Sequence, residues 1–171
     1  MIGRFLAVMA GIAGLVAGSQ APAFTLQYMQ NLTGRIDELK PIVEQFDADV
    51  GRYGYTRDAA IAECATAQGL LEALCNGYAT TVRRYELLTS HYAELSAASD
   101  YTRPLVLLKG ASESDIIREI TRSVMKEYKP AIPTTLDGAA YAGGGFAVLW
   151  GGLSFIFGLL GSIFGVGRRY A

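Results

Sequence analysis

The chain has 171 residues and contains little of what most metal and catalytic sites need. It has one histidine and two cysteines, too few for a typical histidine–cysteine metal site. Only 18% of the residues are charged and the formal net charge is -1, whereas soluble domains are nearer a quarter charged and nucleic-acid binders are basic. These shortages argue against a typical soluble enzyme and against a broadly basic nucleic-acid-binding protein.

Several motifs of enzymes are also missing. We find no strand pattern, no glycine-rich phosphate loop after a strand and no nucleophile placed beside a base. The single histidine, His91, falls between the positions of an apolar stripe, and we expect it on a solvated helix surface. The sequence therefore predicts no enzymatic activity, no catalytic residues, and no cofactor or metal ligands.

Charge is absent altogether from two long runs, residues 5–34 and 138–167. The apolar part of the first run, residues 5–24, has the about 20 residues that a membrane-spanning helix needs, and the second run is longer. Backbone in lipid must be helical when it is not a closed barrel. We therefore expect an all-α membrane protein with two antiparallel transmembrane helices. A cleaved signal peptide is the alternative for the first run, because Arg4 precedes it and small residues follow.

Basic residues at the two ends predict the orientation, since short cytoplasmic flanks are enriched in Lys and Arg. We expect both termini in the cytoplasm of a bacterium and the middle of the chain in the periplasm. The expected domains are a first transmembrane helix at 1–24, a periplasmic helical hairpin with short satellite helices at 25–135, and a second transmembrane helix with a short cytoplasmic tail at 136–171. The predicted membrane-interface anchors are Arg4, Trp150, Arg168, Arg169 and Tyr170.

Small residues recur on both spans at alternating spacings of three and four, which is typical of helices that pack closely in lipid. The first seam is Gly3, Ala7, Ala10, Gly14, Ala17 and Ala21, and the second is Gly144, Ala147, Gly151, Ser154, Gly158, Gly161 and Gly165. An antiparallel alignment with residue numbers summing to about 172 places Gly14 against Gly158. The partner of each seam is either the other span or another subunit.

Apolar residues in the middle of the chain follow the coiled-coil spacing over residues 29–53 and 71–95. Pairing them antiparallel sets Phe46 on Tyr78. Tyrosines 78, 85 and 92 form either core layers or a ladder for a ligand. Pro41 predicts a kink or a restart of the first helix. We also expect a short helix over residues 103–110 and a capping box at residues 112–115 that opens the next helix.

Helix length predicts where the second arm breaks. At 1.5 Å per residue, residues 57–98 as one helix would overshoot the first arm by about 20 Å. We therefore expect a break near Gly69, which lies almost midway between Cys64 and Cys75. In an oxidising compartment the two cysteines would then form a disulfide across the turn. The alternative is two free thiols in one continuous helix.

Short stretches along nearly the whole chain carry a family resemblance. They are MIGRFLA at the start with GSQAP at 18–22, RYE at 84–86, PAIPTTLDG at 130–138, GF at 145–146 and LWG at 149–151. The chain resembles a proteobacterial inner-membrane family classified as a domain of unknown function. The resemblance implies two spans and a helical extracytoplasmic region, but no activity and no site residues. The cysteine pair is not part of that family's pattern.

Three functions remain open from the sequence. The leading hypothesis is a non-enzymatic accessory or scaffold subunit of a larger inner-membrane assembly, with the lipid bilayer and other membrane subunits as partners. The second is a self-assembling homo-oligomer that forms a ring or pore. The third is a small-molecule or lipid sensor that uses the tyrosine-lined hairpin.

Overall fold

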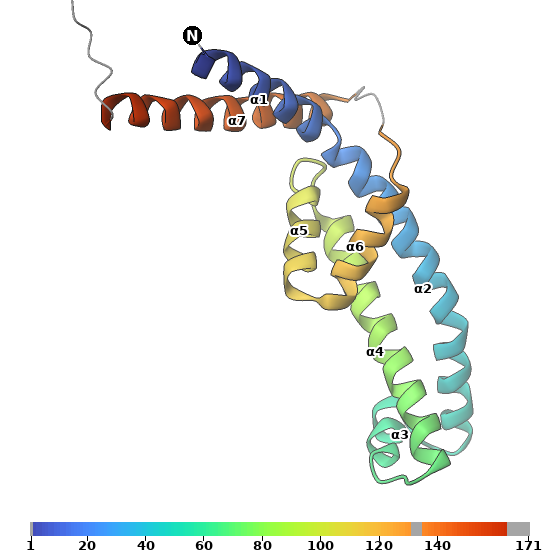
Figure 1. Cartoon of the computed structure of the whole chain (residues 1–171). Helices are drawn as coiled ribbons and strands as arrows, with labels where there is room; N and C mark the ends of the chain where they lie inside the picture. The colour runs from blue at the N-terminus through green and yellow to red at the C-terminus, as the bar shows by residue number, and fades with distance from the viewer. Residues whose placement is uncertain (1, 131–134, 164–171) are drawn as a thin grey trace, which may run out of the picture. The chain divides into compact units, whose positions relative to one another are not determined.

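The computed structural model describes residues 2–130 and 135–163, and this part of the chain is helical with no strand. Figure 1 shows the helices in chain order. The all-helical expectation is confirmed. The helices described are α1 (Ile2–Ser19), α2 (Ala21–Arg52), α3 (Arg57–Cys64), α4 (Leu70–Ala97), α5 (Arg103–Glu113), α6 (Asp115–Glu127) and α7 (Leu136–Ile163).

The chain divides into two compact units. The first contains residues up to Leu26, Asp100–Pro104 and the chain from Glu127 onward, and the second contains Gln27–Ser99 and Leu105–Lys126. The first unit holds the pair α1 and α7, which lie side by side (Figure 1). The second unit holds most of α2 with α3, α4, α5 and α6, and we call it the arm unit.

Two helices are long and apolar enough to cross a membrane, judged by length and composition alone. One apolar window lies in the helical stretch Gly3–Arg52 near the N-terminus, and the other lies in Leu136–Gly161. Most large apolar side chains of α1 and α7 are exposed, among them Phe5, Val16, Val148 and Phe155. Such exposure suits a lipid environment better than water, because the apolar area would otherwise stay hydrated.

The long helix α2 differs from the sequence prediction at its proline. Pro41 lies inside α2, and the helix continues from Ala21 to Arg52 without a restart. Proline removes one backbone donor and normally interrupts a helix. Here the apolar side chains on both sides of it, Leu32 and Val43, are buried in the same core. Packing of this face therefore outweighs the lost hydrogen bond. Of the two predicted outcomes, the restart does not occur, and the kink stays a prediction.

The chain turns twice between α2 and α4. Thr56 caps α3, because its hydroxyl accepts a hydrogen bond from the amide of Ala59 at 3.3 Å. Gly69 precedes α4 with φ of 64°, a left-handed backbone that glycine adopts without steric cost. The predicted break near Gly69 is therefore confirmed.

The start of α6 also differs from the prediction. Ser114, rather than Ser112, accepts a hydrogen bond from the amide of Ile117. The hydroxyl of Ser112 instead donates to the carbonyl of Lys109 within α5. The helix α5 continues to Glu113, three residues beyond the predicted end, so the cap moves to the next available serine.

The core of the arm unit comes from all its long helices. Tyr28 and Val43 of α2, Leu88 of α4 and Leu107 of α5 are buried in it. On α6 the buried positions are Ile117, Ile120, Thr121 and Val124, spaced as one helix face. The predicted contact between Phe46 and Tyr78 is present, with stacked rings whose centroids are 5.1 Å apart.

Candidate functional site

The end of the arm unit is closed by the two cysteines. The Sγ atoms of Cys64, at the end of α3, and Cys75, in α4, are 2.05 Å apart, and their Cα atoms are 5.4 Å apart. In one continuous helix the same residues would be about 16 Å apart, too far for a disulfide. The positive φ at Gly69 makes the pairing possible, because it reverses the chain between the two cysteines. The predicted pair and the predicted turn thus occur together.

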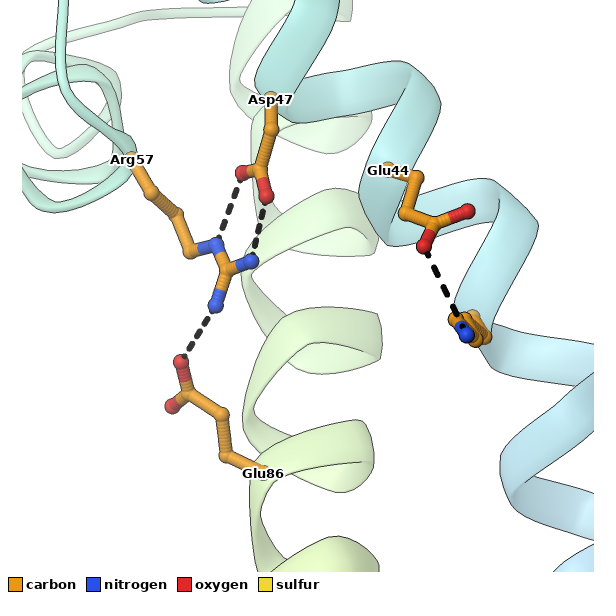
Figure 2. A network of polar contacts seen from close by, with 5 residues as sticks. Glu44, Asp47, Arg57 and Glu86 are labelled. Atoms are coloured by element: carbon orange, nitrogen blue, oxygen red, sulfur yellow. Dashed lines mark hydrogen bonds and ion pairs between the residues drawn. The ribbon is translucent and has the colours of Figure 1, made fainter.

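An arginine at the start of α3, the helix that ends at Cys64, joins three helices (Figure 2). Arg57 of α3 donates from Nε to Oδ1 of Asp47 on α2 at 2.8 Å, and a second bond from Nη2 makes the pair bidentate. Its Nη1 donates to Oε1 of Glu86 on α4 at 3.0 Å. Hydrogen bonding from Arg57 lowers the pKa of Asp47 below its usual value of 3.8. Arg57 thus ties α3 to both long helices, an arrangement that sequence spacing did not suggest.

Replacement of Asp47 should show how much this bridge contributes to the free energy of unfolding. The Asp47 side chain is 38% exposed, so solvent screening limits the expected loss for Asp47→Asn to about 1 kcal/mol at neutral pH. Because the folded pKa is lowered, this contribution exists above pH 3.8 and disappears as the pH falls through the folded value. Thermal unfolding followed by circular dichroism at neutral and strongly acid pH measures both effects.

A matched control is available on the same helix. Lys40 and Glu44 form an exposed pair on α2 at 3.8 Å. Figure 2 labels Glu44 on the same helix as Asp47. Glu44→Gln should cost at most about 0.5 kcal/mol. Equal losses from the Asp47 and Glu44 variants would contradict a bridging role for Arg57.

An open apolar groove lies beside the disulfide. It has a volume of about 520 Å³, and its lining includes Val50, Tyr53, Tyr55, Leu71 and both cysteines. A groove of this size and character suits an apolar side chain or a small apolar ligand. Its carboxylate, Glu63, forms a hydrogen bond that raises the pKa of Tyr55.

The beginning of α4 exposes an apolar face. Leu71, Leu74 and Tyr78 belong to the stripe that the sequence predicted to pack on α2, but they are 59%, 54% and 44% exposed. The buried residues of α4 begin only at Ala79 and continue to Leu95. Tyr85 and Tyr92 are half-buried, so the three tyrosines do not share one environment.

His91 is buried, and the prediction of a solvated surface histidine is wrong. Its side chain is 5% exposed, and its ring meets Tyr28 edge-on at 5.9 Å. Gly110 of α5 lies so close that a Cβ there would overlap the His91 ring. Nε2 of His91 has no hydrogen-bond partner in the described part of the chain. The prediction considered only the pairing of α4 with α2, which would leave His91 in water. In the structure α5 covers this face of α4.

Burial of His91 predicts a pH-dependent stability. Desolvation lowers the pKa of His91 below 6.5, and the opposing charge of Glu94 on the same helix is the smaller effect. The unfolded chain therefore binds a proton more readily below pH 6.5, and the free energy of unfolding should fall there by up to about 1.4 kcal/mol per pH unit. The neighbouring Tyr28 stays neutral in this range, because burial raises its pKa to about 12. His91→Leu should remove this part of the slope.

The measurement is the difference in unfolding free energy between wild type and His91→Leu at neutral pH and about one unit below the normal histidine pKa. Carboxylates titrate equally in both proteins, so they cancel in the difference. Parallel pH profiles for the two proteins would show that His91 does not titrate on unfolding.

The first unit is built on close contact between α1 and α7. A Cβ on Gly14 would collide with the carbonyl oxygen of Gly145, and a Cβ on Gly18 with that of Tyr141. The paired residue numbers sum to 159, so the predicted register with a sum of about 172 is wrong. Gly158, the predicted partner of Gly14, has nothing within 4 Å of an added Cβ. The contact is between helix backbones, which only glycine permits.

The structure brings only part of the predicted seams together. On α1, Gly3, Ala7 and Gly14 are on the buried or half-buried face with Gly11 and Gly18, which the prediction omitted, whereas Ala17 is exposed. The remaining seam residues divide as follows: Ala10, Ala21, Gly151 and Ser154 are half-buried, and Gly144, Ala147, Gly158 and Gly161 are exposed. Four further predicted residues lie outside the described part of the chain: Gly165, Arg168, Arg169 and Tyr170. Of the predicted anchors, Arg4 and Trp150 are exposed.

The described residues contain no group of three or more His, Cys, Asp or Glu side chains that could hold a metal ion. The features they offer are surfaces: the groove at the disulfide, the exposed start of α4 and the outer faces of α1 and α7.

Comparison with known proteins adds a family to this description. No curated protein and no solved structure matches the chain significantly. A family model described as "Protein of unknown function (DUF2937)" matches residues 2–165. Since this match covers both apolar helices and the whole arm unit, the chain belongs to the DUF2937 family of proteins of unknown function.

Proposed function

We propose that the chain is a non-enzymatic, two-span inner-membrane protein that acts as an accessory or scaffold subunit of a larger membrane assembly. In this proposal both termini are cytoplasmic and residues 25–135 form a periplasmic arm. The two apolar helices support insertion in a membrane. The disulfide supports an oxidising compartment for the arm.

Residue contacts support antiparallel packing in both units. In the first unit, Gly14 meets Gly145 while Gly18 meets Tyr141, so rising numbers on α1 meet falling numbers on α7. In the arm unit, rising numbers on α2 likewise meet falling numbers on α4. Tyr28 contacts His91, and Phe46 contacts Tyr78. These contacts favour a transmembrane helix pair and an arm built as a helical hairpin.

The exposed apolar surface at the disulfide end of the arm carries the proposal. Leu70 and Tyr53 are 78% and 82% exposed, and the exposed Leu71 and Leu74 continue the surface along α4. Clusters of exposed apolar side chains on a water-soluble unit mark interaction surfaces. Because a disulfide and a bridging arginine hold this end in one shape, it is suited to present a fixed surface to another protein subunit.

Mild solubilisation followed by native mass measurement tests the proposal. Wild type should be recovered in a heteromeric complex. The double variant Leu71→Glu/Leu74→Glu should be released from it while keeping its helical content, because neither side chain is buried. Leu105→Glu, at an equally exposed position on α5, is the matched control and should remain bound.

Recovery of wild type only as a free monomer would contradict a subunit role. A mass that is a multiple of 18.3 kDa would instead identify a homo-oligomer. The orientation has its own test: a reporter active only in the periplasm should work when inserted near Gly54 and fail when fused after Ala171. The opposite pattern would overturn the proposed topology.

A further inference from the structure

A hollow lies between α1 and α7 near the beginning of α1. Its volume is about 790 Å³, and apolar walls come from Val8, Trp150 and Phe157. Where Gly14 and Gly18 lie, the helix backbones touch. Towards the start of α1, the side chain of Phe157 takes the place of that contact, since its ring would lie 3.3 Å from a Cβ on residue 3. The helices are therefore held apart here, and space remains beside the aromatic ring.

The lining of the hollow also contains two polar side chains, Arg4 and Ser154. Arg4 is exposed, and no salt bridge to it occurs among the residues described. Arg4 also lies in the first turn of α1, where the helix dipole favours negative charge. Gly158 also lines the hollow, and a Cβ added there would have nothing within 4 Å.

We infer that this hollow binds an anionic phospholipid, with an acyl chain along Val8, Trp150 and Phe157 and the headgroup phosphate on Arg4. The inference rests on the proposed insertion of α1 and α7 in a membrane. An arginine matches a phosphate through paired hydrogen bonds, and basic pockets between membrane helices bind anionic headgroups. A zwitterionic lipid would place its own cation near Arg4, so the charge favours an anionic headgroup.

The volume and the position favour a lipid over the other occupants. The hollow is within the range of small-molecule sites, and its walls belong to the two apolar helices that a bilayer would surround. A transmembrane helix of another chain is the competing occupant, because Gly3, Ser154 and Gly158 in the lining are small. Such a helix would have to pack against the bulky rings of Trp150 and Phe157 in the same lining, whereas a flexible acyl chain can fit beside them.

The only tryptophan of the chain, Trp150, lines the hollow and provides a direct probe. The full chain is reconstituted in phosphatidylcholine vesicles that contain a minor fraction of lipid brominated on its acyl chains, which quenches nearby tryptophan. At the same fraction of brominated lipid, phosphatidylglycerol should quench Trp150 more strongly than phosphatidylcholine. The difference should correspond to an enrichment of phosphatidylglycerol beside Trp150 of about fivefold. Arg4→Gln should remove the difference, and Arg4→Lys should retain part of it.

Two glycine variants separate loss of the hollow from loss of the charge. Gly158→Leu should fill the hollow and lower the quenching by the anionic lipid. Gly161→Leu is the control, because it also meets nothing within 4 Å and does not line the hollow. Its quenching should match that of wild type.

The outcomes distinguish this inference from the proposed function. No quenching by either lipid would mean that the helices are not in the bilayer, and would overturn both. Equal quenching of wild type by the two lipids would overturn the lipid site alone. Disulfide formation between two chains carrying Gly158→Cys would also overturn it, because another helix would then occupy the hollow.

Discussion

Gly14→Leu should separate α1 from α7. The Cβ of the new side chain would overlap the carbonyl oxygen of Gly145. A backbone atom cannot move aside as a flexible side chain can. Overpacking of a buried contact commonly costs 1–3 kcal/mol, and here we expect a loss of at least about 3 kcal/mol in the association of the two helices. Dispersion and close approach hold membrane helices together, so little else would replace the contact.

Trp150 fluorescence reports this separation. Its Cβ lies close to the position that a Cβ on Gly11 would occupy, in the same helix contact. In a titration with sodium dodecyl sulfate, the Gly14→Leu variant should show the unfolded-state emission at a lower detergent fraction than wild type. Gly143→Leu places the same side chain on α7 with nothing within 4 Å and should behave as wild type. Coincident transitions for all three proteins would show that α1 and α7 do not pair through Gly14.

Removal of the disulfide should cost about 2–3 kcal/mol of unfolding free energy. The cysteines are 11 residues apart, and closing a loop of this length restricts the unfolded chain by about that amount. In Cys64→Ser/Cys75→Ser the volume hardly changes, so the loss reports the bond rather than the packing. We expect the short helix α3 to fray first, because none of its residues is buried.

Thermal unfolding with and without reductant measures this loss. Reductant should destabilise wild type and leave the double variant unchanged. Intact mass after alkylation of unreduced, freshly denatured protein provides an independent check. Two alkylated thiols in wild type would show that the bond is absent.

The features predicted correctly depend on local chemistry. Cys64, Gly69 and Cys75 could be placed because helix length, turn chemistry and the reach of a disulfide all limit the same few residues. The cap at Thr56 is equally local, because its hydroxyl contacts Ala59 only three residues later. In each case the partners are near in sequence, so few alternative arrangements exist.

The register of the two apolar helices, α1 and α7, was not predictable in this way. Both helices have small residues every three or four positions, so sliding one antiparallel helix along the other by several turns again pairs small residues. The observed register, in which paired residue numbers sum to 159 and not to 172, depends on side chains such as Phe146 and Phe157. These side chains pack against α1 beside the glycines. Spacing alone contains no information about that shape.

The burial of His91 and the bridge at Arg57 were missed for a related reason. His91 is covered by α5 at Gly110, 19 residues later in the chain. Arg57 reaches Glu86, 29 residues away. Pairwise treatment of α2 with α4 omits the third helix in both cases, and no periodicity in the sequence indicates which helix will cover an open face.

The contact of Gly18 with Tyr141 joins residues that are 123 positions apart in the chain. A ribosome that adds 5–20 residues per second needs roughly 6–25 s to make the intervening segment. For that time α1 has no α7 to pack against, and in the proposed membrane topology lipid or the insertion machinery covers its glycine face. The arm unit is synthesised within the same interval, so it can fold before the two apolar helices meet. Helix pairing can therefore follow the folding of the arm unit, and a chain cut short before α7 would leave α1 without its partner.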